Sequence, residues 1–180
     1  MIPSWSTAMF YYFAYGSCMC PVDLKRSLGE SMQGYVIGAA TLEGYRLGFY
    51  HYSKRRRCGA LDIVPDANQS VQGVLYQLPN RVKHALDKRE GVDLGYYRHE
   101  FVPVECNGIQ YASVLTYAVI DKLPVELAPN DWYFDVVMRG AIACGLPKAY
   151  CWQLFEHMRH LQHSYADRVH SYLGRLPQAS

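Results

Sequence analysis

The sequence predicts a single α+β domain in which strands come first and helices are concentrated late. The chain has 180 residues, a length that favours one domain over two, and we expect that domain to span residues 1–180. Runs rich in aromatic and β-branched residues dominate as far as about residue 120, which is typical of strands. After Pro129 the apolar residues recur at helical spacing, and strands and helices segregated in this way indicate an α+β fold.

The N-terminal region predicts a strand, a tight loop and a helix in that order. Residues 9–15 (MFYYFAY) are aromatic and suit a strand that is covered on both faces. Small residues over 16–20 suit a tight loop, and Pro21 fits the first turn of a helix that we expect to reach about Leu28. Because the N–H groups of such a loop and of a helix start point one way, this arrangement can hold an anion.

The middle of the chain predicts further strands, followed by one helix. The expected strands are 35–52 (one long strand or a hairpin), 59–64 and 71–78, the last two separated by a polar turn at 65–69. Apolar positions then step by three and four over 80–90, which predicts a helix that Gly91 ends.

The remaining third predicts a hairpin and two helices. Asn107-Gly108 is the best hairpin signal in the chain, so residues 96–106 and 110–120 are expected to pair. Asn130 is expected to cap a helix through about Cys144, and Pro147 to open another that reaches residues 159–162. The last fifteen residues predict a polar tail.

Composition excludes several classes of protein. A net charge of +2 is too small an excess to indicate a nucleic-acid partner. Residues 54–57 (KRRR) form the one dense basic run, which predicts a solvated loop or, alternatively, a phosphate-binding patch. Residues 1–22 carry no charge, but prolines and small polar residues interrupt them and no basic leader precedes them. We therefore expect a cytoplasmic protein without a membrane segment.

The cysteines and histidines do not have the spacing of a metal site. The six cysteines fit reduced thiols better than a disulfide framework. Cys18 and Cys20 are one residue apart and lack a second pair at zinc spacing. We expect no metal ligands.

Two segments of the sequence contain residues that are suited to catalysis. One is the small-residue loop after the first strand, around Tyr15 to Cys18. The other is residues 86–92 (LDKREGV), where Asp87 and Glu90 lie three apart at a helix end. The partial negative charge of a helix C-terminus disfavours an ionised carboxylate, which favours Glu90 as a general base near neutral pH. The alternative is an exposed glutamate in a frayed last turn.

A family resemblance joins these two places. Residues 12–19 (YFAYGSCM) resemble the Y-F-A-Y-G-S-N signature of the γ-glutamylcyclotransferase-like family. Further segments resemble its later motifs in the same order: Gly59-Ala60, residues 71–76 (VQGVLY), residues 86–92 with Tyr97, and Tyr133 with Gly140-Ala141 and residues 145–147 (GLP). The resemblance spans residues 11–147. Residues 148–180, expected to be a C-terminal helix and tail, match none of these motifs.

The resemblance implies a small mixed β-barrel of about six strands flanked by helices, and one reaction. Such enzymes cleave a small-molecule γ-glutamyl amide when the glutamyl α-amino group attacks its own γ-carbonyl. 5-Oxoproline forms, and a free amine or amino acid departs. Since the attack is intramolecular, no covalent nucleophile, metal or nucleotide is required, and no cofactor is expected.

The resemblance also implies roles for particular residues. Glu90 is the general base that takes a proton from the amine and the acid that returns one to the leaving nitrogen. A loop and a helix tyrosine would contact the glutamyl part: Tyr15, Gly16, Ser17, Cys18, Met19 and Tyr133. For Tyr133 the alternative is a half-buried structural tyrosine.

Cys18 departs from the family pattern, which usually has Asn at this position. A weakly hydrogen-bonding thiol replaces a side-chain amide, so two alternatives stay open. One is a catalytically silent binding module for a γ-glutamyl or other small acidic ligand, and the other is a hydrolase in which Cys18 is the nucleophile. The amine side of the substrate is also open, as is the choice between monomer and homodimer. If residues 54–57 line the mouth of the site, they would favour acidic leaving groups.

Overall fold

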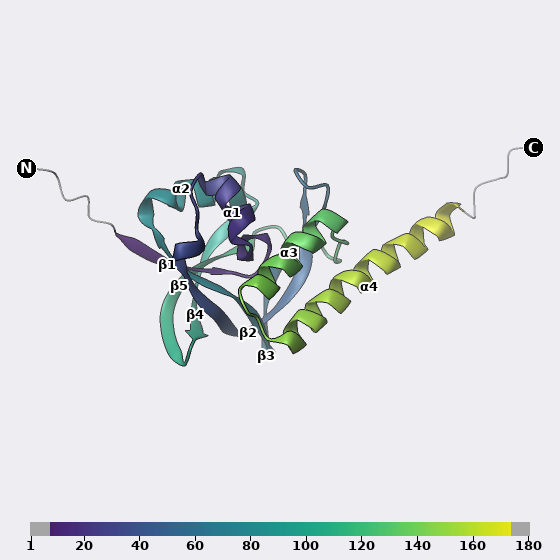
Figure 1. The fold of residues 1–180 in the computed structure, drawn as a ribbon. Coiled ribbons are helices and arrows are strands. Elements are labelled where there is room, and N and C mark those ends of the chain that lie inside the picture. The colour runs from purple at the N-terminus through teal and green to yellow at the C-terminus, as the bar shows by residue number, and fades with distance from the viewer. Residues whose placement is uncertain (1–7, 174–180) are drawn as a thin grey trace, which may run out of the picture.

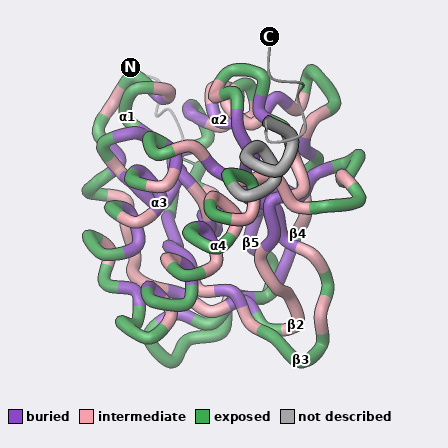
Figure 2. The backbone as a smooth tube through the Cα atoms, turned by 90° about the vertical axis from the view of Figure 1, so that its right-hand side faces the viewer, coloured by how far each residue is buried: buried purple, intermediate pink, exposed green. Residues whose placement is uncertain are grey.

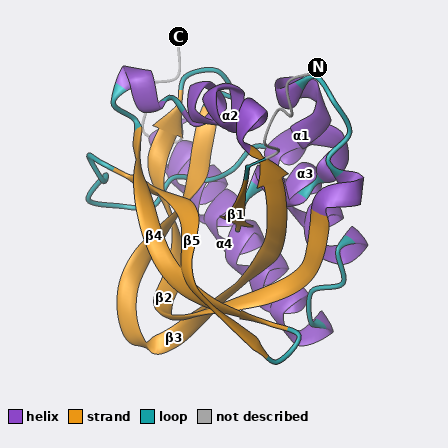
Figure 3. Ribbon diagram, turned by 90° about the vertical axis from the view of Figure 1, so that its left-hand side faces the viewer, coloured by secondary structure: helices purple, strands orange, loops and turns teal. Residues whose placement is uncertain are grey.

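Five strands form a closed barrel in the computed structural model, which describes residues 8–173 and the side chains of residues 8–166 (Figures 1 and 3). The strands are β1 (Met9–Ala14), β2 (Val36–Ser53), β3 (Cys58–Pro79), β4 (Tyr97–Cys106) and β5 (Ile109–Val119). They follow one another around the barrel in the order β1-β3-β2-β4-β5. β1 pairs with β5 in parallel, at Tyr12 and Leu115, and the other pairings are antiparallel. The mixed β-barrel that the resemblance implied is confirmed.

The barrel has five strands where about six were expected, because residues 58–79 form one strand and not two. β3 follows β2 from the pair Ser53–Cys58 to the pair Val36–Tyr76. The segment predicted as a polar turn lies within this strand, where residues 66–69 fall opposite the single residue Gly44. Extra residues on one strand form a bulge, which bends a strand without ending it.

The helices surround one end and one side of the barrel, as Figure 3 shows. They are α1 (Pro21–Leu28), α2 (Lys83–Glu90), α3 (Asp131–Ala143) and α4 (Lys148–Leu173), with 3-10 turns at Ser17–Met19, Gln33–Tyr35, Asn80–Val82 and Val92–Leu94. The predicted cap of α3 is confirmed, since the Asn130 side chain accepts a hydrogen bond from the Tyr133 N–H at 2.9 Å.

α4 is longer than the sequence predicted. It runs for 26 residues to Leu173 and extends away from the barrel (Figure 1), so the expected polar tail is wrong for residues 166–173, and residues 174–180 lie outside the described part. No glycine or proline occurs between Lys148 and Leu173, and polar residues alone do not end a helix. Among the described helices, none is long and apolar enough to cross a membrane.

The core fills the barrel and the layer between the barrel and α3. Figure 2 shows buried residues along the strands and exposed ones on the turns and outer helix faces. α3 approaches the loop after β1 closely at Gly140, where a Cβ atom would lie 2.6 Å from the Cys20 nitrogen. Only glycine permits this approach, which fixes the loop between α3 and the barrel.

Candidate active site

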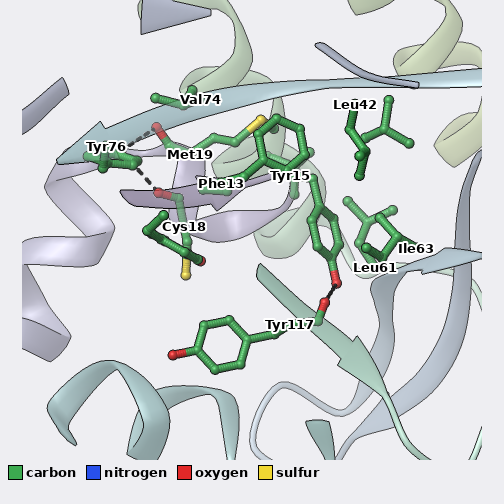
Figure 4. Packing of buried hydrophobic residues seen from close by; sticks show 14 of the residues in the cluster. Phe13, Tyr15, Cys18, Met19, Leu42, Leu61, Ile63, Val74, Tyr76 and Tyr117 are labelled. Carbon is green, nitrogen blue, oxygen red and sulfur yellow. Dashed lines mark hydrogen bonds between the residues drawn. The ribbon is translucent and has the colours of Figure 1, made fainter. Parts of the chain in front are cut away.

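The loop that follows β1 forms one wall of the candidate site. Residues Ser17–Met19 make a 3-10 turn, closed by the Met19 N–H, which donates to the Gly16 carbonyl at 3.0 Å. The hydroxyl of Tyr76 on β3 donates to the carbonyl oxygens of Cys18 and Met19 at 3.1 and 3.2 Å (Figure 4). The loop is therefore held both by its own backbone and by the neighbouring strand.

Met19 belongs to the core. Its side chain is fully buried, and in Figure 4 it points the opposite way from that of Cys18. Its N–H already donates within the turn. The Met19 N–H is thus used inside the turn, whereas the N–H groups of Gly16, Ser17 and Cys18 donate to no acceptor in the described residues.

Glu90 is the last residue of α2 and lies where two hollows of the molecule meet. Gly91 ends the helix directly after it in a left-handed conformation (φ 70°) that suits glycine. The Glu90 side chain is 18% exposed, so it is not the exposed, frayed residue of the alternative interpretation. It lines both a small hollow, here the inner cavity, and a larger one, here the outer cleft. Its carboxylate can therefore reach a ligand in either.

The thiol of Cys18 connects the loop to Glu90. Its Sγ donates to Glu90 Oε1 at 3.0 Å, and Arg89 Nε donates to the same sulfur at 3.0 Å. Burial raises the pKa of Cys18 to about 12 and outweighs the opposite effect of Arg89. The group is thus a protonated thiol at neutral pH, and none of its hydrogen-bond partners in the described chain is a histidine. Cys18 is placed as a donor to Glu90, which does not favour a thiolate nucleophile.

Arg89, which the sequence did not single out, joins three elements beside Glu90. Its side chain is 2% exposed and forms an ion pair with Asp23 of α1. It also donates to the hydroxyls of Ser27 and Ser17, the latter at 3.1 Å. These bonds hold α1 and the loop against the end of α2 and so fix the position of Glu90. The only signal in the sequence was the place of Arg89 on the inward face of the predicted helix.

The inner cavity has a volume of about 30 Å³, and five of its eleven lining residues are tyrosines. Six of the seven predicted site residues line it, all except Met19. The sequence missed the others, which come from four strands and one turn: Tyr12, Arg56, Leu61, Tyr97 and Tyr117.

The tyrosine hydroxyls of this cavity are not equivalent. Tyr15 donates to the Tyr117 carbonyl at 2.6 Å, and Tyr97 donates to the Leu61 carbonyl at 2.8 Å. Tyr133 instead accepts from the Leu61 N–H at 3.1 Å, which leaves its own proton outside that bond. Burial raises the pKa of Tyr133 to about 12, so the phenol stays protonated. Tyr133 can donate to a ligand, whereas Tyr15 offers its ring.

The outer cleft has a volume of about 610 Å³, enough for a small-molecule ligand. It adjoins the inner cavity, since Arg56, Glu90 and Tyr97 line both. Glu90 is the one carboxylate among its lining residues. The lysines and arginines that line it are Arg26, Lys54, Arg55, Arg56, Lys88 and Arg89. The cleft is therefore strongly basic.

Arg56 reaches from the cleft into the cavity. Its guanidinium donates to Ser17 Oγ at 3.1 Å and lies 5.2 Å from the centre of the Tyr133 ring. Its Nε is buried without a hydrogen-bond partner in the described residues. The basic run is exposed at Lys54, Arg55 and Arg57, as a solvated loop would be, but Arg56 is turned inward. The run itself was the signal that could have indicated this residue.

Comparisons with known sequences give relatives over most of the chain. The sequence profile of the AIG2-like family matches residues 70–154. The protein named "Putative gamma-glutamylcyclotransferase YkqA" from Bacillus subtilis (strain 168) is 37% identical over 131 residues, which cover 73% of this chain and 46% of that protein. The chain thus spans about half the length of this curated relative.

Solved structures share the fold. The crystal structure of YkqA from Bacillus subtilis superimposes with a TM-score of 0.79 at 34% identity, over 88% of this chain and 57% of that one. A structure of a gamma-glutamyl cyclotransferase superimposes with a TM-score of 0.74 at 24% identity, over 82% and 86% of the two chains. At that identity the second likeness concerns the fold alone.

Proposed function

The chain belongs to the γ-glutamylcyclotransferase-like family, and from that premise we propose that it cleaves a γ-glutamyl amide to 5-oxoproline and a free amine or amino acid. One observation carries the proposal: the Glu90 carboxylate lies where the inner cavity meets the outer cleft, and the Cys18 thiol is hydrogen-bonded to it. A group that can move protons is thereby next to a space for each half of such a substrate.

The reaction requires two proton transfers and releases no net proton. The α-amino nitrogen bonds to the γ-carbonyl carbon, and the bond from that carbon to the leaving nitrogen then breaks. An ammonium that becomes a ring N–H loses two protons, while an amide N–H that departs as an ammonium gains two. In this proposal Glu90 takes each proton from the first nitrogen and delivers it to the second. Because both nitrogens belong to one substrate, a bound and folded glutamyl arm removes most of the entropic barrier.

The glutamyl half is placed, in this proposal, against the loop. The N–H groups of Gly16, Ser17 and Cys18, with the Arg56 guanidinium, are donors for its α-carboxylate or for the oxyanion that develops on the γ-carbonyl. The Tyr133 hydroxyl is a further donor. A cavity of about 30 Å³ holds only a few atoms. In this proposal it therefore takes part of the glutamyl half, and the leaving half lies in the cleft.

Cys18 is proposed to replace the family's usual Asn as a donor to the catalytic carboxylate. An amide and a thiol can both donate a hydrogen bond, although the thiol is the weaker donor. The distance of 3.0 Å from Sγ to Glu90 Oε1 supports this role. The substitution then changes the strength of one hydrogen bond and leaves the class of reaction unaltered.

The test is release of 5-oxoproline from a panel of γ-glutamyl amides, with Glu90→Gln beside the unchanged protein. The panel holds γ-glutamyl amino acids, glutathione, an ε-linked γ-glutamyl-lysine and a γ-glutamyl diamine. We expect turnover of at least one amide, and a kcat lowered by roughly 10²–10⁴ in Glu90→Gln. Asp93→Asn is the matched control, since Asp93 is an exposed acid three residues after Glu90 that lines neither hollow. It should keep most of the activity.

Two results would overturn parts of the proposal. Turnover that survives Glu90→Gln at full rate would contradict the role of that residue. Thermal stabilisation by a γ-glutamyl ligand without any turnover would favour the second candidate, a binding module that lacks catalysis. The observation that favours this candidate is Cys18 in place of the family's Asn.

A further inference from the structure

We propose that the outer cleft selects γ-glutamyl amides whose leaving group is anionic, with a dicarboxylic amino acid preferred as the leaving group. This inference rests on the proposed function and names the substrate class of the same site. It is drawn from the cations that line the cleft, where the proposed function places the leaving group.

Most of these cations have no carboxylate partner. Arg89 is paired with Asp23 and lies 4.0 Å from Glu90. The other five lining cations form no ion pair within 4.0 Å among the residues that the structure describes: Arg26, Lys54, Arg55, Arg56 and Lys88. Unpaired positive charge gathered in one concave place attracts and concentrates anions.

Arg55 and Arg56 show what this arrangement costs in the absence of an anion. Partial desolvation, and then the guanidinium groups of Arg56 and Arg89, lower the pKa of Arg55. The Arg56 Nε is a buried donor with no acceptor in the described residues, and such a group is unfavourable until a ligand accepts from it. The carboxylates of a bound γ-glutamyl peptide would offset both effects.

In this proposal the cations fall into two groups, one for each half of the substrate. Arg56 contacts Ser17 of the loop, so it serves the glutamyl α-carboxylate, which every γ-glutamyl amide has. Arg26, Lys54, Arg55 and Lys88 then remain around the leaving group. A leaving group with one carboxylate offsets little of this charge and a leaving amine adds to it, whereas two or more carboxylates match it best. A free acidic dipeptide and a longer γ-linked glutamyl chain share this chemistry.

His51 does not add to this positive charge near neutral pH. His51 lines the cleft, and burial lowers its pKa, so its ring is neutral at pH 7. The selectivity therefore depends on lysine and arginine side chains, which keep their charge throughout the neutral range.

The experiment compares kcat/KM for γ-glutamyl-glutamate and γ-glutamyl-glutamine, which differ by one charge at nearly equal shape. We expect the acidic peptide to be favoured about tenfold at low ionic strength, since several weak exposed ion pairs act together. The ratio should fall as salt is added. A γ-glutamyl diamine should be the poorest substrate, and a γ-linked triglutamate tests whether a chain is used better than a dipeptide.

A double variant and a control variant test which residues cause the preference for the acidic peptide. The double change Lys54→Ala with Arg55→Ala should bring the ratio close to one, without lowering kcat for the glutamine peptide. Arg57→Ala is the matched control, because Arg57 belongs to the same basic run but lines a different pocket. It should leave the ratio unchanged.

The outcomes separate this inference from the function on which it rests. Equal kcat/KM for the two peptides, or a preference that survives the double change, would overturn the inference and leave the reaction established. If no amide is converted, calorimetric binding of the same two peptides decides instead. A preference for the acidic peptide that the double change abolishes would then uphold the charge selectivity alone, and equal binding would overturn both proposals.

Discussion

In the inner cavity three of the five tyrosine hydroxyls donate to the protein itself, whereas in the outer cleft five cations have no carboxylate partner in the described structure. Tyr15, Tyr97 and Tyr117 each donate to a fixed acceptor at 2.6 to 2.8 Å. These bonds set the shape of the cavity without a ligand, whereas under the proposed selectivity the charges of the cleft become paired when an anionic ligand binds. We therefore expect changes in the cavity to alter the rate of the proposed reaction, and changes in the cleft to alter the choice of substrate.

Arg89 is an exception to this difference. It lines the cleft, but its side chain is bound to the protein itself, at Asp23 and Ser17. Arg89→Met would leave the Asp23 carboxylate buried without its partner, at a cost of about 3–5 kcal/mol in the free energy of unfolding. Urea unfolding measures this cost. Arg81→Met is the control, since the pair of Arg81 with Glu30 is exposed and should contribute far less to the free energy of unfolding. Similar losses in both variants would contradict a structural role for Arg89.

Changes at Cys18 test the expectation that cavity residues affect the rate. Cys18→Ala removes the donor to Glu90 and should lower kcat about tenfold, the effect of one hydrogen bond to a charged group. Cys18→Asn should recover most of the rate, because an amide N–H can donate in place of the thiol. Steady-state kinetics with the best amide of the panel measures both effects.

The same residue predicts the form of the pH profile. With a pKa of about 12, the Cys18 thiol stays protonated between pH 7 and pH 10, so the hydrogen bond to Glu90 persists and no step in activity from this group should appear there. A nucleophilic thiolate would instead give a rising limb in this range and an inactive Cys18→Asn.

Asp87 gives the smallest expected effect. Burial acts to raise its pKa, but hydrogen bonds from Tyr117, His99 and Lys83 outweigh burial, and the pKa of Asp87 is lowered. A carboxylate with a lowered pKa in the folded state stabilises the protein above the unfolded value of about 3.9 and loses that contribution as the pH falls through the folded value.

Asp87→Asn should therefore reduce the free energy of unfolding by about 1 kcal/mol at pH 7, and the difference should shrink below about pH 4. Chemical unfolding at several pH values measures this dependence. A difference that grows towards acidic pH would have the wrong sign for this account.

Local signals in the sequence predicted most of the elements. Pro21, Gly91, Asn107-Gly108 and Asn130 each mark a start, a stop or a turn through backbone geometry, and the structure has each feature within a few residues of its expected place. The continuity of β3 was missed because a bulge and a turn use the same polar residues. Its path depends on pairing with β2, which is a long-range property.

The site was predictable only in part, for a similar reason. The loop and Glu90 lie in short motifs, and the barrel brings them together across 72 positions of sequence. Arg56, Arg89 and Tyr117 reach the same place from a turn, a helix and a strand, with no common spacing that a pattern could reveal. Met19 was included because it follows Cys18 in the motif, yet the tight turn directs its side chain into the core.

The most direct test of the account is the single-turnover rate of 5-oxoproline formation from saturating γ-glutamyl-glutamate. We predict that Glu90→Gln lowers this rate by roughly 10²–10⁴ while it still binds the substrate, and that Lys54→Ala with Arg55→Ala weakens binding with little change in the saturated rate. An unchanged saturated rate in Glu90→Gln would contradict the central claim that the carboxylate between cavity and cleft carries the protons.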